Sequence, residues 1–214
     1  MAKTENNSVK DIDGNTYNLV QIGKQIWTAE NLNVSKFRNG DEIKEVTDAN
    51  EWNKADFPAW CYYENDKEKY GGVIGKLYNF YAVTDERGLA PEGWEIPTVE
   101  DFEQLATNVG GVDCAYKLKS KKAGTWSKKE DVTKATDEFG FSVIGVGSRA
   151  GGSWGAPFMN RLIYASLWTN TFMDEHYALT CSFSCWHDNI STVRSRAESI
   201  REKQVGCSVR IKKK

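Results

Sequence analysis

The chain has 214 residues and a formal net charge of −2 at pH 7. This balance gives no general attraction to nucleic acid or to an anionic membrane. No apolar run approaches the roughly 18 residues of a membrane span, so membrane insertion is not expected either. Residues 1–7 lack the hydrophobic core of a signal peptide, and we therefore expect either synthesis in the cytoplasm or a sequence from which an export signal has been trimmed. The five cysteines are odd in number and irregularly spaced, which argues against a disulfide framework.

Turn residues organise the first part of the chain. Asp13-Gly14-Asn15 and Gly23-Lys24 favour tight turns, because glycine supplies the positive φ that a hairpin needs. Three antiparallel strands are predicted around these turns, over residues 9–12, 16–22 and 25–27. We expect residues 1–8 to be a disordered lead-in and residues 9–214 to form a single domain.

Further elements are predicted from capping residues and apolar patterning. Asp48 favours the start of a short helix that extends to Trp52, and the aromatic run over 58–63 indicates a strand. Residues 77–83 fit a helix or a strand, since periodicity alone does not separate the two.

A longer helix is predicted from Thr98 to Val109. The Thr98 hydroxyl can accept a free N–H of the first turn, and Asp101 can reach back as in a capping box. Apolar residues then recur at helical spacing on one face, and Gly110-Gly111 provides the stop.

The second half of the chain is less regular. We predict a short helix over 113–118, a solvated lysine-rich loop over 117–134 and a buried strand over 139–144. From Gly145 onward, glycine, small residues and large aromatics mix without a strict period. Order is expected to return at residues 177–183, 190–193 and 207–211, followed by Lys212–Lys214 as a solubilising tail or a cloning remnant.

Several motifs occur in a fixed order along the chain: residues 11–17, 22–32, 75–79, 91–98, 139–142 and 206–210. Together they resemble the Fibrobacter succinogenes major paralogous domain over almost the whole chain. Residues 96–102 are also similar to the helix entry of formylglycine-generating-enzyme-like proteins. Both resemblances imply an α+β, C-type-lectin-like fold, with a few helices around small twisted antiparallel sheets and with the termini close together.

The chain departs from this family at two positions. Relatives often carry one cysteine before the Pro-x-Gly-Trp motif and another after the terminal Val-Arg, where this chain has Ala90 and Ile211. If these cysteines pair in exported relatives, their joint loss fits a protein that does not meet an oxidising compartment.

The resemblance also suggests a function for residues 145–204. Some proteins with a C-type-lectin-like fold are targets of diversity-generating retroelements, which rewrite adenine-containing codons to vary a binding face. The mixture of small, aromatic and polar residues here resembles such a region, set between the framework-like segments 168–171 and 178–179. The decisive signature lies in the codons, so this stays a hypothesis.

The predicted ligand-binding face combines aromatic contact area with polar groups that give direction, as in antibody paratopes. Its residues are Ala150, Gly152, Ser153, Trp154, Phe158, Arg161, Leu162, Ile163, Tyr164, His176, Tyr177, Ser182, Ser184, Cys185, Trp186, His187 and Asn189. Aromatic rings can instead belong to the core. We expect Trp168 and Phe183 to be core, and Trp154 and Trp186 to be exposed.

Metal binding and catalysis are the alternatives. Cys181, Cys185, His187 and Cys207 could supply zinc ligands, but their spacing fits no common zinc pattern and buried thiols are the preferred interpretation. Asp188-Asn189 faintly resembles part of a lectin calcium site without the partner motif. Two histidines are too few for the three-histidine iron site of sulfoxide synthases, and no nucleophile elbow or phosphate loop occurs. We therefore expect no catalytic residues, no metal and no cofactor.

The sequence thus predicts a non-enzymatic protein that recognises a protein or glycan on another cell. A phage tail or receptor-binding protein is preferred to an exported bacterial adhesin, and an oligomer or a fusion to a larger tail or surface assembly stays open. The first alternative is a fixed carbohydrate-binding or structural module of a Bacteroidetes-type surface protein. The second is a copper-dependent oxidase of the formylglycine type, for which Cys181 and Cys185 would be the cysteine pair.

Overall fold

Two glycine turns shape the start of the fold, as predicted. In the computed structural model, which describes residues 7–127, 135–192 and 199–214, Gly14 and Gly23 adopt φ of 85° and 62°. They join β1 (Ser8–Lys10), β2 (Thr16–Ile22) and β3 (Gln25–Thr28), which pair antiparallel. Because β1 begins at Ser8, the predicted lead-in over 1–8 is too long. Residues 1–6 lie outside the described residues.

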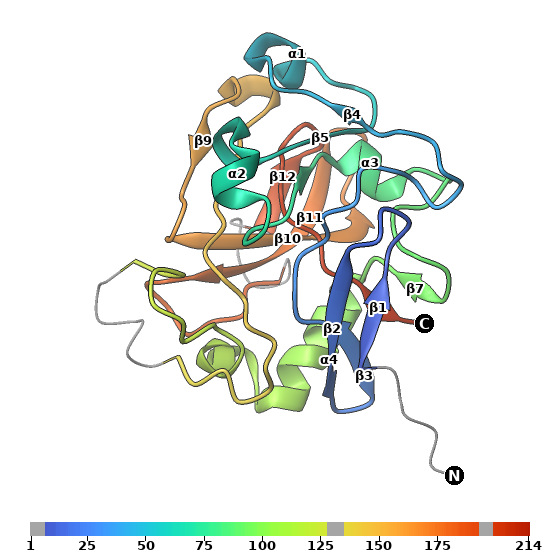
Figure 1. The fold of residues 1–214 in the computed structure, drawn as a ribbon. Coiled ribbons are helices and arrows are strands. Elements are labelled where there is room, and N and C mark those ends of the chain that lie inside the picture. The colour runs from blue at the N-terminus through green and yellow to red at the C-terminus, as the bar shows by residue number, and fades with distance from the viewer. Residues whose placement is uncertain (1–6, 128–134, 193–198) are drawn as a thin grey trace.

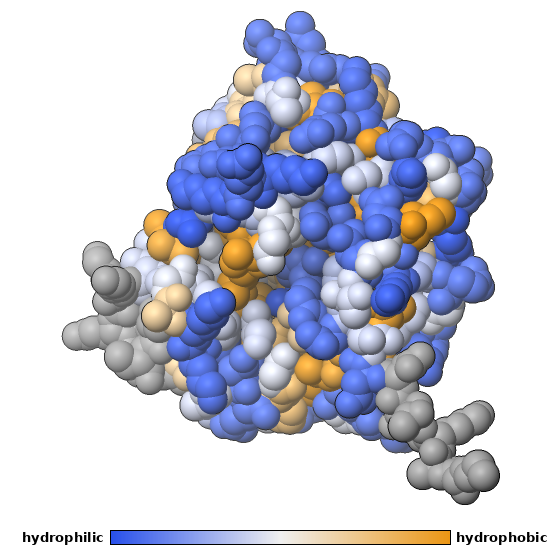
Figure 2. Space-filling model, in the orientation of Figure 1, coloured by the Kyte–Doolittle hydropathy of each residue, from blue (hydrophilic) through white to orange (hydrophobic). Residues whose placement is uncertain are grey.

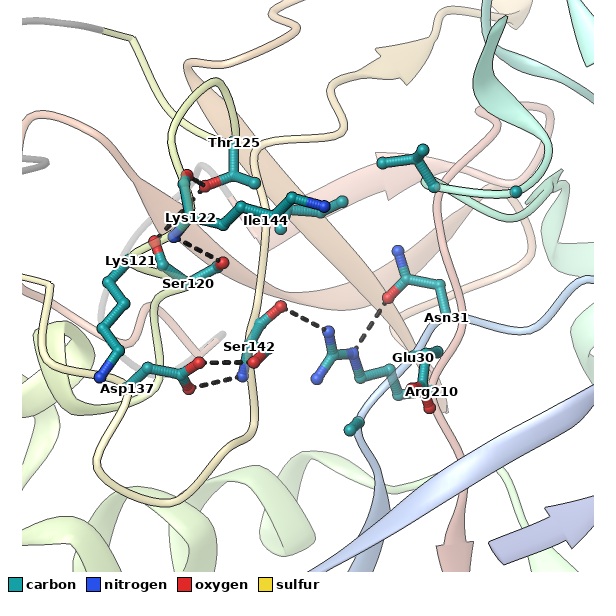
Figure 3. Close-up of a pocket in the computed structure, with 13 residues that line it drawn as sticks. Glu30, Asn31, Ser120, Lys121, Lys122, Thr125, Asp137, Ser142, Ile144 and Arg210 are labelled. Carbon is teal, nitrogen blue, oxygen red and sulfur yellow. Dashed lines mark hydrogen bonds between the residues drawn. The ribbon is translucent and has the colours of Figure 1, made fainter. Parts of the chain in front are cut away.

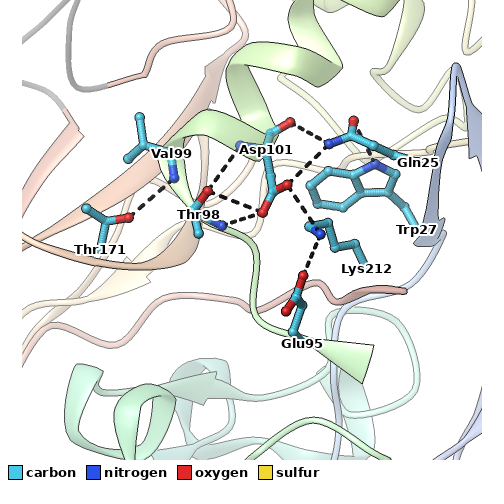
Figure 4. Close-up of polar contacts among 8 residues, drawn as sticks. All are labelled: Gln25, Trp27, Glu95, Thr98, Val99, Asp101, Thr171 and Lys212. Carbon is cyan, nitrogen blue, oxygen red and sulfur yellow. Dashed lines mark hydrogen bonds and ion pairs between the residues drawn. The ribbon is translucent and has the colours of Figure 1, made fainter. Parts of the chain in front are cut away.

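The C-terminal lysines are part of this sheet, which corrects the prediction of a solubilising tail. Lys212 and Lys213 form β13, which lies between β3 and β7 (Trp94–Glu95) and pairs with both. The Lys212 ammonium lies 2.5 Å from Glu95 Oε1 and 3.3 Å from Asp101 Oδ1 (Figure 4). The described beginning and end of the chain therefore share one five-stranded sheet (Figure 1), and the ends lie close together, as the resemblance implies.

The predicted central helix is confirmed as α4 (Val99–Val109). Thr98 accepts the N–H of Asp101 at 3.2 Å, and Asp101 accepts the N–H of Thr98 at 2.9 Å, so the capping box is complete (Figure 4). The helix ends at Gly110, which has a left-handed φ of 111°. Its apolar face is buried against a cluster that includes Trp27 and Phe183.

The other helices are short. They are α1 (Ala49–Asn53), α2 (Lys67–Tyr70) and α3 (Phe80–Thr84), with the 3-10 turns η1 (Tyr63–Asn65), η2 (Val112–Lys117) and η4 (Gly152–Trp154). Asp48 caps α1 as predicted. The ambiguous stretch 77–83 contains both structures, because Asn79 ends strand β6 and caps α3 with its side chain. None of the helices in the described ranges is long and apolar enough to cross a bilayer.

Three further sheets complete the α+β fold of the described residues (Figure 1). They consist of β4 (Lys44–Glu45), β5 (Ala59–Cys61) and β6 (Leu77–Tyr78); of β8 (Ser148–Arg149) and β9 (Phe158–Met159); and of β10 (Tyr164–Phe172), β11 (Tyr177–Ser184) and β12 (Ile200–Glu202). All pairs are antiparallel except β4 with β5, which is parallel.

The strand predicted over 139–144 is wrong, although Phe141 and Val143 are buried. Ser142 has a φ of 51°, which a strand does not accommodate, and the Asp137 carboxylate holds it there by accepting its N–H and its hydroxyl. The Phe141 carbonyl accepts from Arg210 instead of from a neighbouring strand. The strand predicted over 190–193 is reduced to one bridge between Ser191 and Ser182, and Val193 lies outside the described residues.

The lysine-rich loop is corrected at Lys119. Its side chain is 2% exposed, and its ammonium donates to His187 O at 2.7 Å and lies 3.2 Å from Asp188 Oδ1. It therefore fixes the start of the 187–192 segment rather than facing solvent. Lys128, Lys129 and Lys134 lie outside the described residues.

The segment from Val205 to Ile211 is buried at every residue and crosses between the sheets. Gly206 exchanges two hydrogen bonds with Arg149 of β8, and Cys207 pairs with Tyr78 of β6. Trp168 of β10 donates its N–H to Ser208 O at 2.9 Å, and Thr28 of β3 donates to Ile211 O at 3.0 Å. One extended segment thus contacts all four sheets.

Gly206 is closely packed between Trp52 and Arg149. Gly206→Ala is therefore expected to lower the free energy of unfolding by about 1–3 kcal/mol. An added Cβ would lie 2.8 Å from Cζ2 of Trp52, and the two hydrogen bonds to Arg149 prevent the backbone from moving away. Urea unfolding measures the loss.

Gly72→Ala is the matched control, because a Cβ there would meet nothing within 4 Å. Its free energy of unfolding should stay within about 0.5 kcal/mol of the parent value. Equal unfolding midpoints for the two variants would contradict the close packing at Gly206.

Candidate functional site

The hairpin of β10 and β11 places a short polar turn at the edge of the molecule. Trp168 pairs with Thr180, and the register then shifts by a bulge before Phe172 pairs with Ala178. β11 is buried along seven of its eight residues, from Ala178 to Ser184. The bulge and the turn over 173–176 therefore extend from a strand whose two faces are both covered.

The Asp174 carboxylate shapes the turn. It accepts the N–H groups of His176 and Tyr177, each at 2.8 Å. These bonds hold the Asp174 pKa below its usual value, so the carboxylate stays ionised at neutral pH. Phe172 and Met173, which precede it, are 65% and 57% exposed. The turn thus presents an apolar pair beside a fixed negative charge.

Residues distant in sequence complete a hollow beside the turn. The N–H of Phe80 donates to Lys203 O at 2.8 Å, which joins α3 to the turn that follows β12. The Lys203 ammonium lies 5.8 Å from the centre of the Phe172 ring. A cavity of about 490 Å³ is bordered by α3, the hairpin tip and Lys203, with Tyr81, Asn170 and Glu175 in its wall. This volume lies within the range of small-molecule sites.

The 3-10 turn η4 adds an aromatic residue at the same end of the sheet. Ser153 binds the Glu202 carboxylate through its N–H at 2.9 Å and through its hydroxyl. Glu202 is the cross-strand partner of Tyr177, so η4 lies against the β11–β12 end. Trp154 is 75% exposed. We call the surface formed by Ser153, Trp154, Tyr81, Phe172–Tyr177 and Lys203 the tip face.

The structure separates the predicted site residues by exposure. Those that are exposed are Ser153, Trp154, His176, Tyr177, Trp186 and His187, and those that are half-buried are Gly152, Phe158, Arg161, Leu162, Ile163, Tyr164 and Asn189. The expected exposure of Trp154 and Trp186 is confirmed, and so is the burial of Trp168 and Phe183.

Four predicted site residues are corrected, because their side chains are buried: Ala150, Ser182, Ser184 and Cys185. Ser182 packs between Ser166 and Thr180, with oxygen–oxygen distances of 3.3 Å to each. Ser184 accepts the N–H of Trp186, and Cys185 belongs to the cluster around α4. Both faces of β11 are covered, so neither Ser182 nor Ser184 is displayed.

The remaining predicted residues do not form one surface with the tip face. Tyr164 stacks edge-on against Trp186, with 5.4 Å between ring centres, at the opposite end of the β10–β11 ladder. Phe158 packs on Tyr63, and Arg161 lies 5.0 Å over the ring of Tyr70. The structure therefore brings together Gly152, Ser153, Trp154, His176 and Tyr177, and it places the others elsewhere.

The cysteines are held in separate parts of the core. Cys181 and Cys185 lie in the cluster around α4, whereas Cys207 lies in another cluster and His187 is exposed, so the candidate zinc set is not assembled. All five cysteines are free. Burial raises the pKa of the Cys61 and Cys207 thiols to about 12, and that of Cys181 further. A nucleophilic thiolate requires the opposite shift.

Several tip-face residues were missed from the sequence. The run Met173-Asp174-Glu175-His176 lies between two strands, and its polar turn residues would have indicated a loop. Tyr81 and Lys203 gave no such signal, because only the contact between α3 and the end of β12 brings them to the hairpin.

The comparisons identify the class of the domain. A family model for the Fibrobacter succinogenes major domain matches residues 20–213. The chain belongs to this family. No curated protein and no solved structure matches the chain.

Two tryptophans test the division between surface and core. Trp168→Ala should cost about 3–5 kcal/mol of unfolding free energy, because the ring is fully buried, packs on Phe80 and donates to Tyr78 O at 2.7 Å. Trp154→Ala should change stability by no more than about 0.5 kcal/mol. Thermal and urea unfolding measure both, and a large loss for Trp154→Ala would show that its ring packs in solution.

Proposed function

We propose that this domain is a non-enzymatic recognition module with a C-type-lectin-like fold. It binds a protein or glycan on the surface of another cell through the tip face. The observation that carries the proposal is the gathering of Trp154, Phe172, Met173 and Tyr177, all exposed large side chains, at one end of a rigid sheet. Exposed aromatic residues on a fixed support are typical of binding hot spots.

The chemistry of the tip face suits such a ligand. The Phe172 and Trp154 rings offer apolar contact, and the Asp174 carboxylate, the Asn170 amide and the Lys203 ammonium can form directed hydrogen bonds around the cavity. Because the Asp174 carboxylate already orders the turn, little conformational entropy is lost when a ligand binds. Burial raises the pKa of the Cys61, Cys181 and Cys207 thiols, which disfavours a thiolate nucleophile at these positions.

We further propose that the tip face is diversified by a retroelement. A sheet with both faces buried supports this idea, because substitutions at exposed turn positions leave its packing unchanged. The free state of all five cysteines, together with Ala90 and Ile211 at the family's cysteine positions, supports assembly in a reducing compartment. A phage tail protein fits this better than an exported adhesin.

Substitutions at the tip face should remove binding without unfolding the domain. Phe172→Ala and Trp154→Ala are each expected to weaken ligand binding by about tenfold or more. Binding of the labelled protein to a panel of bacterial strains, or to a glycan panel, measures this effect. Melting temperatures should stay unchanged. Trp186→Ala, at the other end of the sheet, is the control and should keep full binding. Loss of binding in the control alone would place the site at Trp186 instead.

Sequencing of codons 145–211 in a growing host population tests diversification. Adenine-directed substitutions are expected at exposed tip-face positions such as Ser153, Met173 and His176, and none at the buried Ser182 and Cys185. A uniform sequence would contradict active diversification in that population and would favour a fixed surface module.

A further inference from the structure

A second cavity lies far in sequence from the tip face and has a different chemistry. It has a volume of about 490 Å³ and is bordered by segments 29–31, 72–73, 120–125 and 137–144 and by Arg210 (Figure 3). On the face shown in Figure 2, hydrophobic residues are scattered in small groups among hydrophilic ones. That face offers charges and hydrogen bonds rather than a large apolar patch.

Arg210 forms a buried wall of this cavity. Its side chain is 1% exposed, and its guanidinium donates to Asn31 Oδ1 at 3.0 Å, to Ser142 O at 3.2 Å and to Phe141 O (Figure 3). These acceptors are all neutral. Burial lowers the Arg210 pKa to about 10, so the guanidinium is charged at neutral pH.

This charge has no carboxylate partner among the described residues. Glu30 and Asp137 both border the cavity and their negative charges act on Arg210 from a distance, but the hydrogen bonds of each carboxylate go to other groups. Glu30 accepts the N–H and the amide of Asn18 at 2.8 and 2.7 Å, and Asp137 accepts the N–H and hydroxyl of Ser142. Burial of a charge that no carboxylate contacts directly is costly. Two of the five N–H groups of the guanidinium also have no acceptor in the described part of the chain.

Two lysines add positive charge on the opposite wall. Lys121 and Lys122 are exposed, and neither forms an ion pair with a described residue. In Figure 3 the Lys122 side chain extends in the direction of Ile144. Ser120 and Thr125 also border the cavity, with their hydroxyls bound to backbone groups of the same loop, and Ile144 and Val73 supply apolar surface.

A second buried arginine shows what a purely structural role looks like here. Arg149 also donates to backbone carbonyls, at Val46 and Thr47, but its guanidinium lies between the rings of Trp52 and Phe158, at 4.7 and 5.0 Å. Arg210 stacks on Phe141 at 4.3 Å and borders an open cavity with cationic residues across from it. Both arginines donate to backbone carbonyls. Only Arg210 of the two also borders a cavity with lysines in its wall.

We propose that this cavity binds a small ligand through an oxyanionic group, with Arg210 as the buried counter-charge and Lys121 and Lys122 as the entrance cations. A carboxylate, sulfate or phosphate group supplies the acceptors that the guanidinium lacks. The remainder of the ligand lies against Val73 and Ile144. This site is separate from the tip face, so either proposal can fail without the other.

Titration of the full chain with sodium sulfate, sodium phosphate and sodium glucuronate tests the site, with glucose and sodium chloride at equal ionic strength as references. Calorimetry should show saturable binding of at least one oxyanion in about the millimolar range or tighter. Tighter binding of glucuronate would identify a carboxylate as the ligand group, and tighter binding of sulfate or phosphate a tetrahedral oxyanion. Absence of saturable binding for all three oxyanions would overturn the proposal.

The double variant Lys121→Gln/Lys122→Gln should bind about fivefold more weakly, because two entrance charges are lost. Lys24→Gln/Lys54→Gln removes two exposed charges that do not border the cavity and should bind like the parent chain. Equal weakening in both double variants would show unspecific attraction and overturn the site. These surface variants avoid Arg210 itself, whose replacement removes three structural hydrogen bonds.

Nuclear magnetic resonance locates the ligand directly. The Arg210 Nε–H signal and the amide signals of Gly72 and Ser142 should shift along the same saturation curve. Shifts confined to residues outside the cavity would overturn the proposal even if an anion binds.

Discussion

The fold depends on one extended segment, residues 205–213, which contacts each of the four sheets. It pairs with Arg149, with Tyr78, with Trp168 and finally with strand β3. Three of the sheets have only two or three strands, and a two-stranded sheet is at best marginally stable alone. The segment supplies hydrogen-bond partners and apolar side chains to all of them, with Val209 and Ile211 fully buried. Stability is therefore a property of the assembled sheets rather than of any one.

This arrangement explains how one end of the molecule can carry exposed aromatic side chains. The β10–β11 hairpin is fixed at its centre by core contacts of Leu167 and Phe183 on one side and of Trp168 on the other. Its tip extends beyond those contacts, where the Asp174 carboxylate and a few backbone hydrogen bonds set the turn. Side chains at the tip are consequently free of packing constraints, whereas those a few residues away in the same strands are not.

Features determined by neighbouring residues could be predicted from the sequence. The capping box of Thr98 and Asp101, the hairpin turn at Gly14 and the cap at Asp48 all depend on atoms within a few positions. The family was also identified from motifs that span most of the chain. A C-type-lectin-like fold remains a proposal, since the structure itself establishes only the α+β arrangement.

Features determined by distant partners could not be predicted. Three lysines in a row suggest solvent, yet Lys212 enters a sheet because Glu95 and Asp101 are placed to receive it. The apolar run at 139–144 suggests a strand, yet its carbonyls at Phe141 and Ser142 accept hydrogen bonds from Arg210 instead. The tip face combines α3, η4 and the end of β12, and α3 and β12 are more than a hundred positions apart in the sequence. The local sequence pattern carries no information about contacts between residues that are distant in sequence.

The position of the joining segment also has a consequence for synthesis. Residues 205–213 contact every sheet, so folding of the domain is complete only after they have left the ribosome. Until then, the earlier strands lack some of their hydrogen-bond partners. A premature stop upstream removes the segment and, with it, the contacts that it makes with every sheet. If the preceding codons are rewritten by substitution, as we propose, copies that acquire a stop codon lose these contacts.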